Sequence, residues 1–282
     1  MKNFWYSYQN MLYSALQKSY LIFFRRIFGI FYKFVIRFIR HNFSSKIIDL
    51  DNFKDQNYFS LDLDTLFIKF NCDKGSFCEF NNKKVNTHKY SIFYEKYFSH
   101  LKKNKLNILE LGSHQGKGIA GFYFYFPNSK IIGANINPFE MKFKSKRIDE
   151  LYVDVSSEKI LKNFANHIEE NLDIIIDDAS HNLRDILIAF SVLFKKLKKG
   201  GTYVIEDLDQ FHVFNELNPY SNELTPKEIL TCIKNNKNFK SSFIDDEEKK
   251  YLFENIEDIK LEKGLMIIEN SNVSDVAFIK KI

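Results

Sequence analysis

Four acidic residues and one histidine follow two apolar runs of the sequence, and their types could support metal and proton chemistry. The stretch IIIDDASH ends in Asp177, Asp178 and, three positions later, His181, whereas the stretch YVIED ends in Glu206 and Asp207. Carboxylates at close range repel each other and raise each other's pKa, and a divalent cation relieves that repulsion. Oxygen ligands select a hard ion such as Mg²⁺, with Ca²⁺ and Mn²⁺ as alternatives. A nearby histidine titrates close to neutral pH and can serve as a base.

The spacing of the two runs predicts that three of these carboxylates meet. A right-handed crossover makes the runs parallel neighbours about 4.8 Å apart, so that Asp178, Glu206 and Asp207 converge at one edge of a sheet. The competing interpretation is that these acids cap helices or pair with lysines. His181 also has an ordinary interpretation as a surface or capping residue, but its position beside the acids favours a base.

The elements that must position these residues alternate between strand and helix. Apolar runs predict strands at 106–111, 130–136, 151–155, 172–178 and 202–207. Helical spacing predicts helices at 88–104, 117–126, 157–171 and 182–201, the last one closed by two glycines, and another helix from Thr225-Pro226. Residues 264–282 predict two strands joined by a short Asn/Ser turn. We therefore expect a doubly wound, Rossmann-like α/β fold, with a mostly parallel sheet and a C-terminal antiparallel hairpin.

The first predicted strand ends in LELGSHQGKG, a glycine-rich turn that could approach a ligand. Glu110 precedes glycines at 112, 116 and 118. Ligands of a doubly wound sheet bind beyond the carboxyl ends of its strands, where a carboxylate can hold a ribose diol or a cationic group. A tight turn without any ligand has the same pattern, so that this motif is weak by itself.

The net charge is distributed unevenly along the chain. Residues 1–48 contain no Asp or Glu and carry +8, which leaves −3 for the remainder of a chain whose total is +5. This distribution argues against a nucleic-acid-binding domain. On a helical wheel the basic residues of 11–43 fall within about 120°, opposite a wide aromatic face. We expect a basic amphipathic helix that lies on an anionic membrane surface, with packing on the domain or on a second subunit as the alternative.

Three motifs resemble those of the class I S-adenosylmethionine-dependent methyltransferases. They are ILELGSHQGKG, DIIIDDASH and KKGGTYVIEDL, preceded by DKG at 73–75 and HKY at 88–90. Within that class they resemble the group of the macrolide sugar O-methyltransferases of the mycinamicin type and the cephalosporin hydroxylase family, from about residue 73 to the C-terminus. The resemblance implies S-adenosylmethionine and Mg²⁺ as cofactors, His181 as general base, and Asp178, Glu206 and Asp207 as metal ligands. It places Glu110, Gly112, Ser113, Gly116, Asn135, Asp154 and Asp177 around the cofactor.

Two positions depart from the pattern of that group. Ala179 replaces a glycine, which is a small change, and Asn135 replaces the acid that holds the ribose hydroxyls. An asparagine can accept a hydrogen bond but lacks the charge, so we expect a loss of about 1 kcal/mol in cofactor binding.

The resemblance implies methyl transfer to a hydroxyl of a sugar or glycan-type acceptor. The acceptor would be a small molecule or a lipid-linked sugar, with no nucleic acid involved. Two alternatives stay open: a degenerate methyltransferase-fold binding module at the membrane surface, which Asn135 favours, and a hydroxylase, which the strand-helix alternation disfavours.

The chain is expected to have three parts, namely the amphipathic helix in 1–48, a connector in 49–87, and the methyltransferase domain in 88–282. No uncharged window in the first part approaches the roughly 20 residues of a transmembrane span, and no signal-peptide cleavage pattern is visible. Three cysteines without a CxxC motif argue against a disulfide framework and a zinc site. We expect a cytoplasmic protein, peripheral on the inner membrane surface, and compatible with a homo-oligomer.

Overall fold

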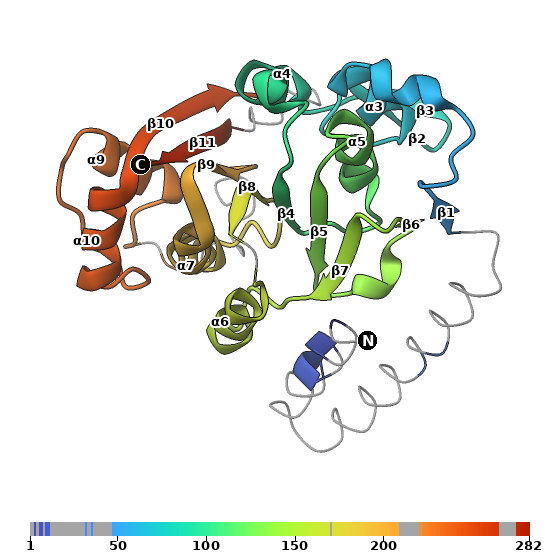
Figure 1. Ribbon diagram of the computed structural model, residues 1–282. Coiled ribbons are helices and arrows are strands. Elements are labelled where there is room, and N and C mark those ends of the chain that lie inside the picture. Colours follow the sequence, from blue (N-terminus) through green and yellow to red (C-terminus); the bar gives the residue numbers. More distant parts are fainter. Residues whose placement is uncertain are drawn as a thin grey trace.

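A computed structural model describes the chain over residues 47–169, 171–208, 220, 222–264 and 275–282, and at isolated positions 3, 6, 7, 9–11, 32 and 35. Its centre is a seven-stranded sheet with the order β10-β11-β9-β8-β4-β5-β7 (Figure 1). Five strands are parallel: β4 (Asn107–Leu111), β5 (Lys130–Asn135), β7 (Ile148–Tyr152), β8 (Leu172–Asp177) and β9 (Leu197–Ile205). β11 (Asp275–Lys281) pairs antiparallel with β9, and β10 (Ile256–Lys263) pairs antiparallel with β11. The expected fold class is confirmed.

Helices cover both faces of the sheet, because the apolar side chains of each strand point alternately to one face and to the other. On β8, Ile174 and Ile176 belong to one core, together with residues of α3 (Leu63–Lys69), α4 (Ser91–Phe98) and α5 (Lys117–Tyr125). Ile175 points to the opposite core, which contains residues of α6 (Glu158–His167), α7 (Leu183–Leu193) and α9 (Pro226–Lys234). Successive side chains of a strand face opposite sides, so that a continuous apolar run is needed to fill two cores.

The remaining described elements are short or lie at the periphery. They are β1 (Ile48–Asp49), β2 (Phe77–Phe80), β3 (Lys83–Asn86), β6 (Phe143–Lys144), α10 (Asp246–Asn255) and the 3₁₀ helices η1 (Gln56–Ser60), η2 (Ser99–Leu101), η3 (Pro138–Glu140) and η4 (Phe194–Lys196). α9 begins with a capping box, in which the Thr225 hydroxyl accepts from the backbone N–H of Glu228 and the Glu228 carboxylate accepts from that of Thr225.

The predicted helix at 182–201 is too long at its C-terminal end. α7 ends at Leu193, and β9 already begins at Leu197, which pairs with Leu172 and is 3% exposed. The next paired residues are Ile174 and Thr202, so the glycines lie in an irregularity of the strand and do not cap a helix. Gly200 has φ +75°, a left-handed conformation that glycine adopts without strain.

Two other boundaries differ from the prediction. The strand expected at 151–155 begins earlier, at Ile148, where it pairs with β5 as the edge of the sheet. The first strand of the C-terminal pair is β10, which ends at Lys263, before the predicted range of 264–282 begins. Residues 265–274 lie outside the described part of the chain.

The expected connector at 49–87 is folded onto the domain. Leu63, Leu66 and Phe67 of α3 are fully buried in the same core as α5, and β1 pairs with β6. β2 and β3 form an antiparallel hairpin. The turn that joins α3 to this hairpin carries Lys74, which is important for the site described below.

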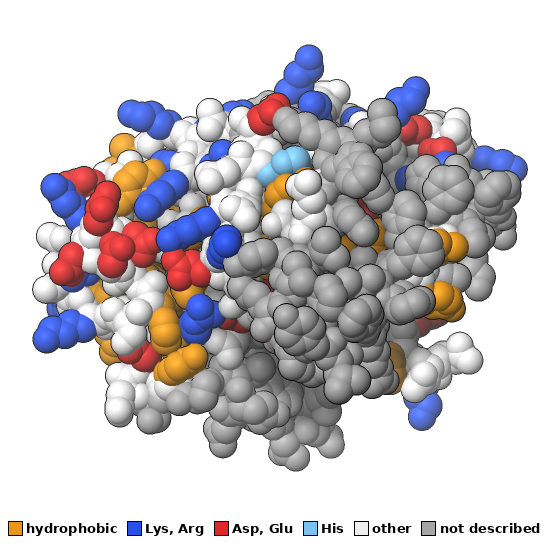
Figure 2. Space-filling model, turned by 90° about the horizontal axis from the view of Figure 1, so that it is seen from below, with side chains coloured by type: hydrophobic (Ala, Val, Ile, Leu, Met, Phe, Trp, Pro, Cys, Tyr) orange, Lys and Arg blue, Asp and Glu red, His pale blue; other side chains and the backbone are white. Residues whose placement is uncertain are grey.

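The predicted amphipathic helix at 11–43 lies largely outside the described residues. The positions described before it pack on the domain: the Tyr6 ring stacks on His167 at 3.9 Å between centroids, and the Ser7 hydroxyl accepts a hydrogen bond from the backbone N–H of Tyr152. No described helix is long and apolar enough to cross a membrane. On the face seen in Figure 2, the described surface carries Lys and Arg side chains interspersed with Asp and Glu.

Candidate active site

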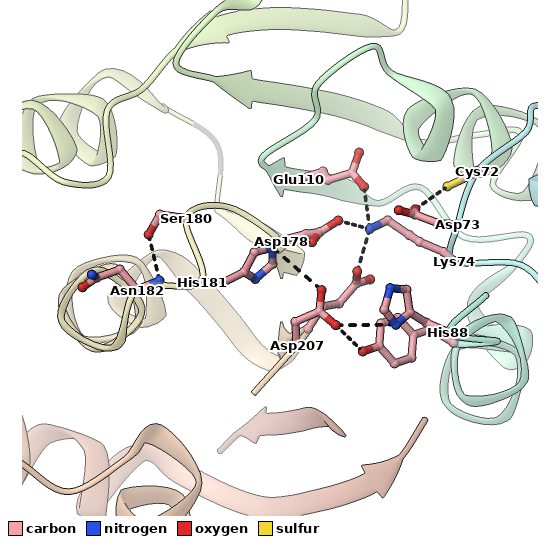
Figure 3. A network of polar contacts seen from close by, with 12 residues as sticks. Cys72, Asp73, Lys74, His88, Glu110, Asp178, Ser180, His181, Asn182 and Asp207 are labelled. Atoms are coloured by element: carbon pink, nitrogen blue, oxygen red, sulfur yellow. Dashed lines mark hydrogen bonds and ion pairs between the residues drawn. The ribbon is translucent and has the colours of Figure 1, made fainter. Parts of the chain in front are cut away.

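Three neighbouring parallel strands, β4, β8 and β9, bring their acidic residues to one edge of the sheet. The register pairs Leu111 with Asp177 and Asp177 with Ile205. The chain therefore leaves β8 at Asp178 beside the point where it leaves β9 at Glu206. Figure 3 shows that the carboxylates of Glu110, Asp178 and Asp207 gather there with Lys74.

The buried part of this acidic cluster, which we call the inner half, consists of Lys74, Glu110, Glu206 and Tyr94. The Lys74 side chain is 3% exposed, and its ammonium donates to Glu206 Oε2 at 2.6 Å and to Asp178 Oδ2. Lys74 Nζ also lies 3.6 Å from Glu110 Oε1. The Tyr94 hydroxyl, from α4, donates to Glu206 Oε1. Both oxygens of Glu206 are thus occupied by groups of the protein.

The charges of the inner half depend on one another. Burial alone would lower the pKa of Lys74, but the carboxylates of Asp178, Glu206 and Glu110 raise it well above its usual range. Burial raises the pKa of Glu110 to about 7 and that of Glu206 well above its usual range, while Lys74 acts in the opposite direction on both. Lys74 is therefore a charged ammonium and the main counter-charge of these buried acids.

The outer half of the cluster consists of Asp178, His181 and Asp207. His181 Nε2 lies 3.6 Å from Asp178 Oδ1 and 3.8 Å from Asp207 Oδ2. One ligand atom of each residue lies within 4.8 Å of the others, a spacing that could hold a metal ion. The Tyr90 hydroxyl donates to Asp207 Oδ1 at 2.8 Å, and His88 Nδ1 lies 3.6 Å from the same oxygen.

Two residues of the outer half have strained backbone conformations. His181 and Asp207 both have φ +53°, in the left-handed region that residues other than glycine seldom adopt. Such conformations cost about 1 kcal/mol or more and cluster at functional sites. Gly112 also has positive φ, and a Cβ there would lie 1.8 Å from the carbonyl oxygen of Asp178. The glycine-rich turn therefore packs directly against the end of β8.

Two cavities flank that turn, and Gly112 lines both. The first, of about 310 Å³, includes Lys74, Glu110, Ser113 and Asp178 in its wall. The second, of about 170 Å³, is lined by residues that include Asn135, Asp154 and Ala179. Five of the seven predicted cofactor residues thus line one or both cavities: Glu110, Gly112, Ser113, Asn135 and Asp154.

The structure places the other two predicted cofactor residues, Asp177 and Gly116, outside the walls of both cavities. Asp177 is 3% exposed and accepts a hydrogen bond from the Tyr203 hydroxyl at 3.0 Å, and burial raises its pKa to about 7. Gly116 precedes α5 with φ +77°, and a Cβ there would lie 1.9 Å from Met141 Sδ. Gly116 is therefore the N-cap residue of α5, packed against Met141.

Four residues that contact the acids are not among the predicted site residues: Lys74, His88, Tyr90 and Tyr94. Three of them lie in the DKG and HKY motifs, which carry the resemblance but no predicted role. Tyr94 follows HKY by one helical turn, so that its hydroxyl and that of Tyr90 point to neighbouring acids, Glu206 and Asp207.

Comparisons with known proteins show similarity to O-methyltransferases. No family model matches the chain. It is 30% identical over 132 residues to 8-demethyl-8-alpha-L-rhamnosyl tetracenomycin-C 2'-O-methyltransferase of Streptomyces olivaceus, covering 44% of this chain and 34% of the relative. It is 27% identical over 133 residues to mycinamicin VI 2''-O-methyltransferase of Micromonospora griseorubida, covering 43% and 32%. The chain spans about a third of the length of the curated relatives that it matches.

A solved structure extends the likeness to most of the fold. The MycE methyltransferase of the mycinamycin biosynthetic pathway, in complex with Mg, SAH and mycinamycin VI, superposes with a TM-score of 0.57 at 20% identity, over 78% of this chain and 54% of that one. The chain therefore has the fold of the class I S-adenosylmethionine-dependent methyltransferases and resembles the macrolide sugar O-methyltransferases of the mycinamicin and tetracenomycin type.

Proposed function

We propose that this protein transfers a methyl group from S-adenosylmethionine to a hydroxyl of a sugar or glycan-type acceptor, with the help of a divalent metal ion. The observation that carries the proposal is the position of the loop after β8. Asp178 lines the first cavity, Ala179 and Ser180 line the second, and His181 of the same loop reaches Asp207. One loop thus joins the two cavities to the candidate metal and base residues.

The residues present fit both cofactors. Glu110 Oε2 is a buried carboxylate oxygen without a hydrogen-bond partner among the described residues, and Glu110 lines the first cavity, where an ammonium group such as that of the methionine moiety would pair with it. The outer half offers carboxylate oxygens at a spacing that suits a hard ion. Mg²⁺ is commonly bound through one or two carboxylates and several waters, so the outer half provides enough ligands. The relatives named as sugar O-methyltransferases, and MycE with Mg and SAH, support the same cofactors.

The chain's own residues would divide the work. When bound, S-adenosylmethionine supplies a sulfonium methyl group, and Mg²⁺ lowers the pKa of a hydroxyl that it contacts. Asp178 and Asp207 would hold the ion, while Asn135 and Asp154 would border the cofactor in the second cavity. His181 would accept the hydroxyl proton at Nε2. The walls of both cavities would fix the reacting groups, and much of the acceleration would come from that positioning.

The test is transfer of a labelled methyl group from S-adenosylmethionine to a panel of methyl glycosides that carry neighbouring hydroxyls. We expect activity that EDTA abolishes and Mg²⁺ restores, and that is lost in Asp178→Ala and His181→Ala. Asp246→Ala is the matched control, because that side chain is 96% exposed on α10. Activity that resists both chelation and these substitutions would refute the proposed metal and base.

Calorimetric titration with S-adenosylmethionine addresses the binding-module alternative. Asn135 lines the second cavity but lacks the charge of the acid usually found there. We expect binding with an affinity lowered about tenfold or less by this difference. An Asn135→Asp variant should then bind more tightly than the natural chain. Absence of any binding would favour a degenerate module. Membrane contact through residues 11–43, a lipid-linked acceptor and homo-oligomerisation stay predictions.

A further inference from the structure

The inner half of the acidic cluster already contains a cation of the protein's own. Lys74 reaches it from the turn between α3 and the β2–β3 hairpin, more than a hundred residues before Asp178. Its ammonium is within 3.6 Å of carboxylate oxygens of Glu110 and Glu206 and donates to Asp178 as well (Figure 3). At 3% exposure the ammonium has little access to water, so these acids are its main partners.

This arrangement separates two residues that the sequence placed together as metal ligands. Glu206 has one oxygen on Lys74 and the other on the Tyr94 hydroxyl, and its side chain is 2% exposed. Asp207, the next residue, turns the other way because of its left-handed backbone, and its carboxylate meets His181, Tyr90 and His88. The group of residues with metal-like spacing contains Asp207 but not Glu206.

Asp178 links the two halves. One oxygen, Oδ2, accepts from Lys74, and the other, Oδ1, faces His181 at 3.6 Å. The lysine therefore fixes the rotation of this carboxylate and leaves one oxygen for the outer half. A residue that binds one oxygen of a metal-ligating carboxylate, and so orients the other oxygen toward the metal, acts as a positioning residue.

We propose that Lys74 is a positioning residue whose positive charge keeps Glu206 out of the metal site. A divalent ion is thereby confined to the outer half, where Asp178 and Asp207 lie beside His181. This inference rests on the proposed metal site. It assigns Glu206 a supporting role, in which the residue anchors Lys74, and it gives the DKG motif a function. Two carboxylates with several waters are an ordinary set for Mg²⁺, so that the loss of Glu206 as a ligand leaves a workable site.

Binding of Mn²⁺ to the full chain tests the proposal without any need for a substrate. Free Mn²⁺ is followed by electron paramagnetic resonance during titration, in the absence of S-adenosylmethionine. Asp207→Asn should weaken binding at least tenfold, because it removes a ligand, whereas Glu206→Gln should change the dissociation constant by less than threefold. Lys74→Met should tighten binding at least tenfold, because removal of the nearby positive charge frees the inner carboxylates for the ion.

Two further variants make the result specific. In Lys74→Met/Glu206→Gln the tighter binding of Mn²⁺ should disappear, because the carboxylate that Lys74→Met frees is absent. This variant also replaces the buried ion pair with neutral groups, so that it should stay folded if Lys74→Met alone unfolds. Lys96→Met removes a half-exposed lysine that pairs with Glu262, and should leave Mn²⁺ binding unchanged.

The outcomes distinguish the two proposals. If Glu206→Gln weakens Mn²⁺ binding as much as Asp207→Asn, or if Lys74→Met fails to tighten it, then Lys74 does not confine the ion, although the metal-dependent function stands. A double variant that binds at least tenfold more weakly than the natural chain would also overturn the role of Lys74. If the natural chain binds no Mn²⁺, the metal site fails and both proposals fall.

Discussion

The two halves of the acidic cluster solve the same electrostatic problem in different ways. In the inner half, Glu110 and Glu206 are at most 3% exposed and meet Lys74 and Tyr94, all supplied by the chain. In the outer half, the side chains of His181 and Asp178 are 27% and 22% exposed, and that of Asp207 is 10% exposed. A buried acid is stabilised by a counter-charge or by hydrogen-bond donors of the fold. A more accessible acid can instead bind an ion from solution.

This difference separates structure from chemistry within one cluster. The inner half connects the turn after α3 to the ends of β4, β8 and β9, and its loss should act first on stability. The outer half contains the proposed metal and base residues, and its loss should act first on activity. Substitutions in and around the cluster test that separation.

The largest effect is expected for Asp207→Asn. This change keeps the size of the side chain and its contact with the Tyr90 hydroxyl, but removes a charge from the proposed metal site. Methyl transfer should fall by roughly a thousandfold at saturating Mg²⁺, which is the order seen when a key electrostatic group of a transition state is lost. Thermal unfolding should change little. A variant that loses stability in proportion to activity would show that the outer half is structural.

His181→Gln should have the next largest effect on activity, a loss of about a hundredfold, because glutamine keeps polarity but cannot accept the proton. The pH profile of methyl transfer should differ between the natural chain and the variant, because the variant lacks the proposed base. His114→Gln is the control, since that histidine is exposed and pairs with Glu140. An identical pH profile in His181→Gln would assign the proton transfer to another group.

The doubly wound fold class and the meeting of the acids at the carboxyl ends of the strands could be predicted from the sequence, and the physical reason is local. Apolar runs of the strand type end directly at Asp178 and at Glu206, and parallel strands share their carboxyl edge. Lys74 could not be placed by the same reasoning. Its segment looks like a polar connector, and its contact with Asp178 spans 104 positions of the chain. The alternative interpretation, that these acids pair with lysines, agrees with the ion pairs of Lys74 with Asp178 and Glu206.

The boundaries that were missed have a similar cause. Residues 197–201 continue the helical pattern of α7, but the pairing of Leu197 with Leu172 takes them into β9. Tertiary pairing outweighs local propensity there, as it often does in strands. For Asp177, the resemblance to the methyltransferase group implied a place beside the cofactor, and its side chain accepts a hydrogen bond from the Tyr203 hydroxyl.

Gly112→Ala should disturb both halves together, because a Cβ would overlap the carbonyl of Asp178 and the residue has φ +79°. We expect a loss of about 3 kcal/mol or more in the free energy of unfolding, from strain and overpacking together. Gly200→Ala is the matched control: it has φ +75° but no atom within 4 Å of the added Cβ, so it should cost only about 1 kcal/mol. Chemical denaturation of both variants measures the difference. Equal losses would mean that backbone strain, and not the contact with β8, limits this turn.

The smallest effect compares two tyrosines of α4, one that donates to a buried glutamate and one that donates to a partly exposed glutamate. Tyr94→Phe removes the hydroxyl that donates to Glu206, and Tyr97→Phe removes the hydroxyl that donates to Glu262, one turn further along α4. Glu206 is 2% exposed and Glu262 is 20% exposed. An unsatisfied buried acceptor costs about 1.5–3 kcal/mol, whereas water can replace the donor at Glu262, so that Tyr97→Phe should cost less than about 0.5 kcal/mol. Denaturation midpoints give both values, and Mn²⁺ affinity should stay within threefold in Tyr94→Phe. If that affinity changes tenfold instead, Glu206 belongs with the metal and the boundary between the two halves lies elsewhere.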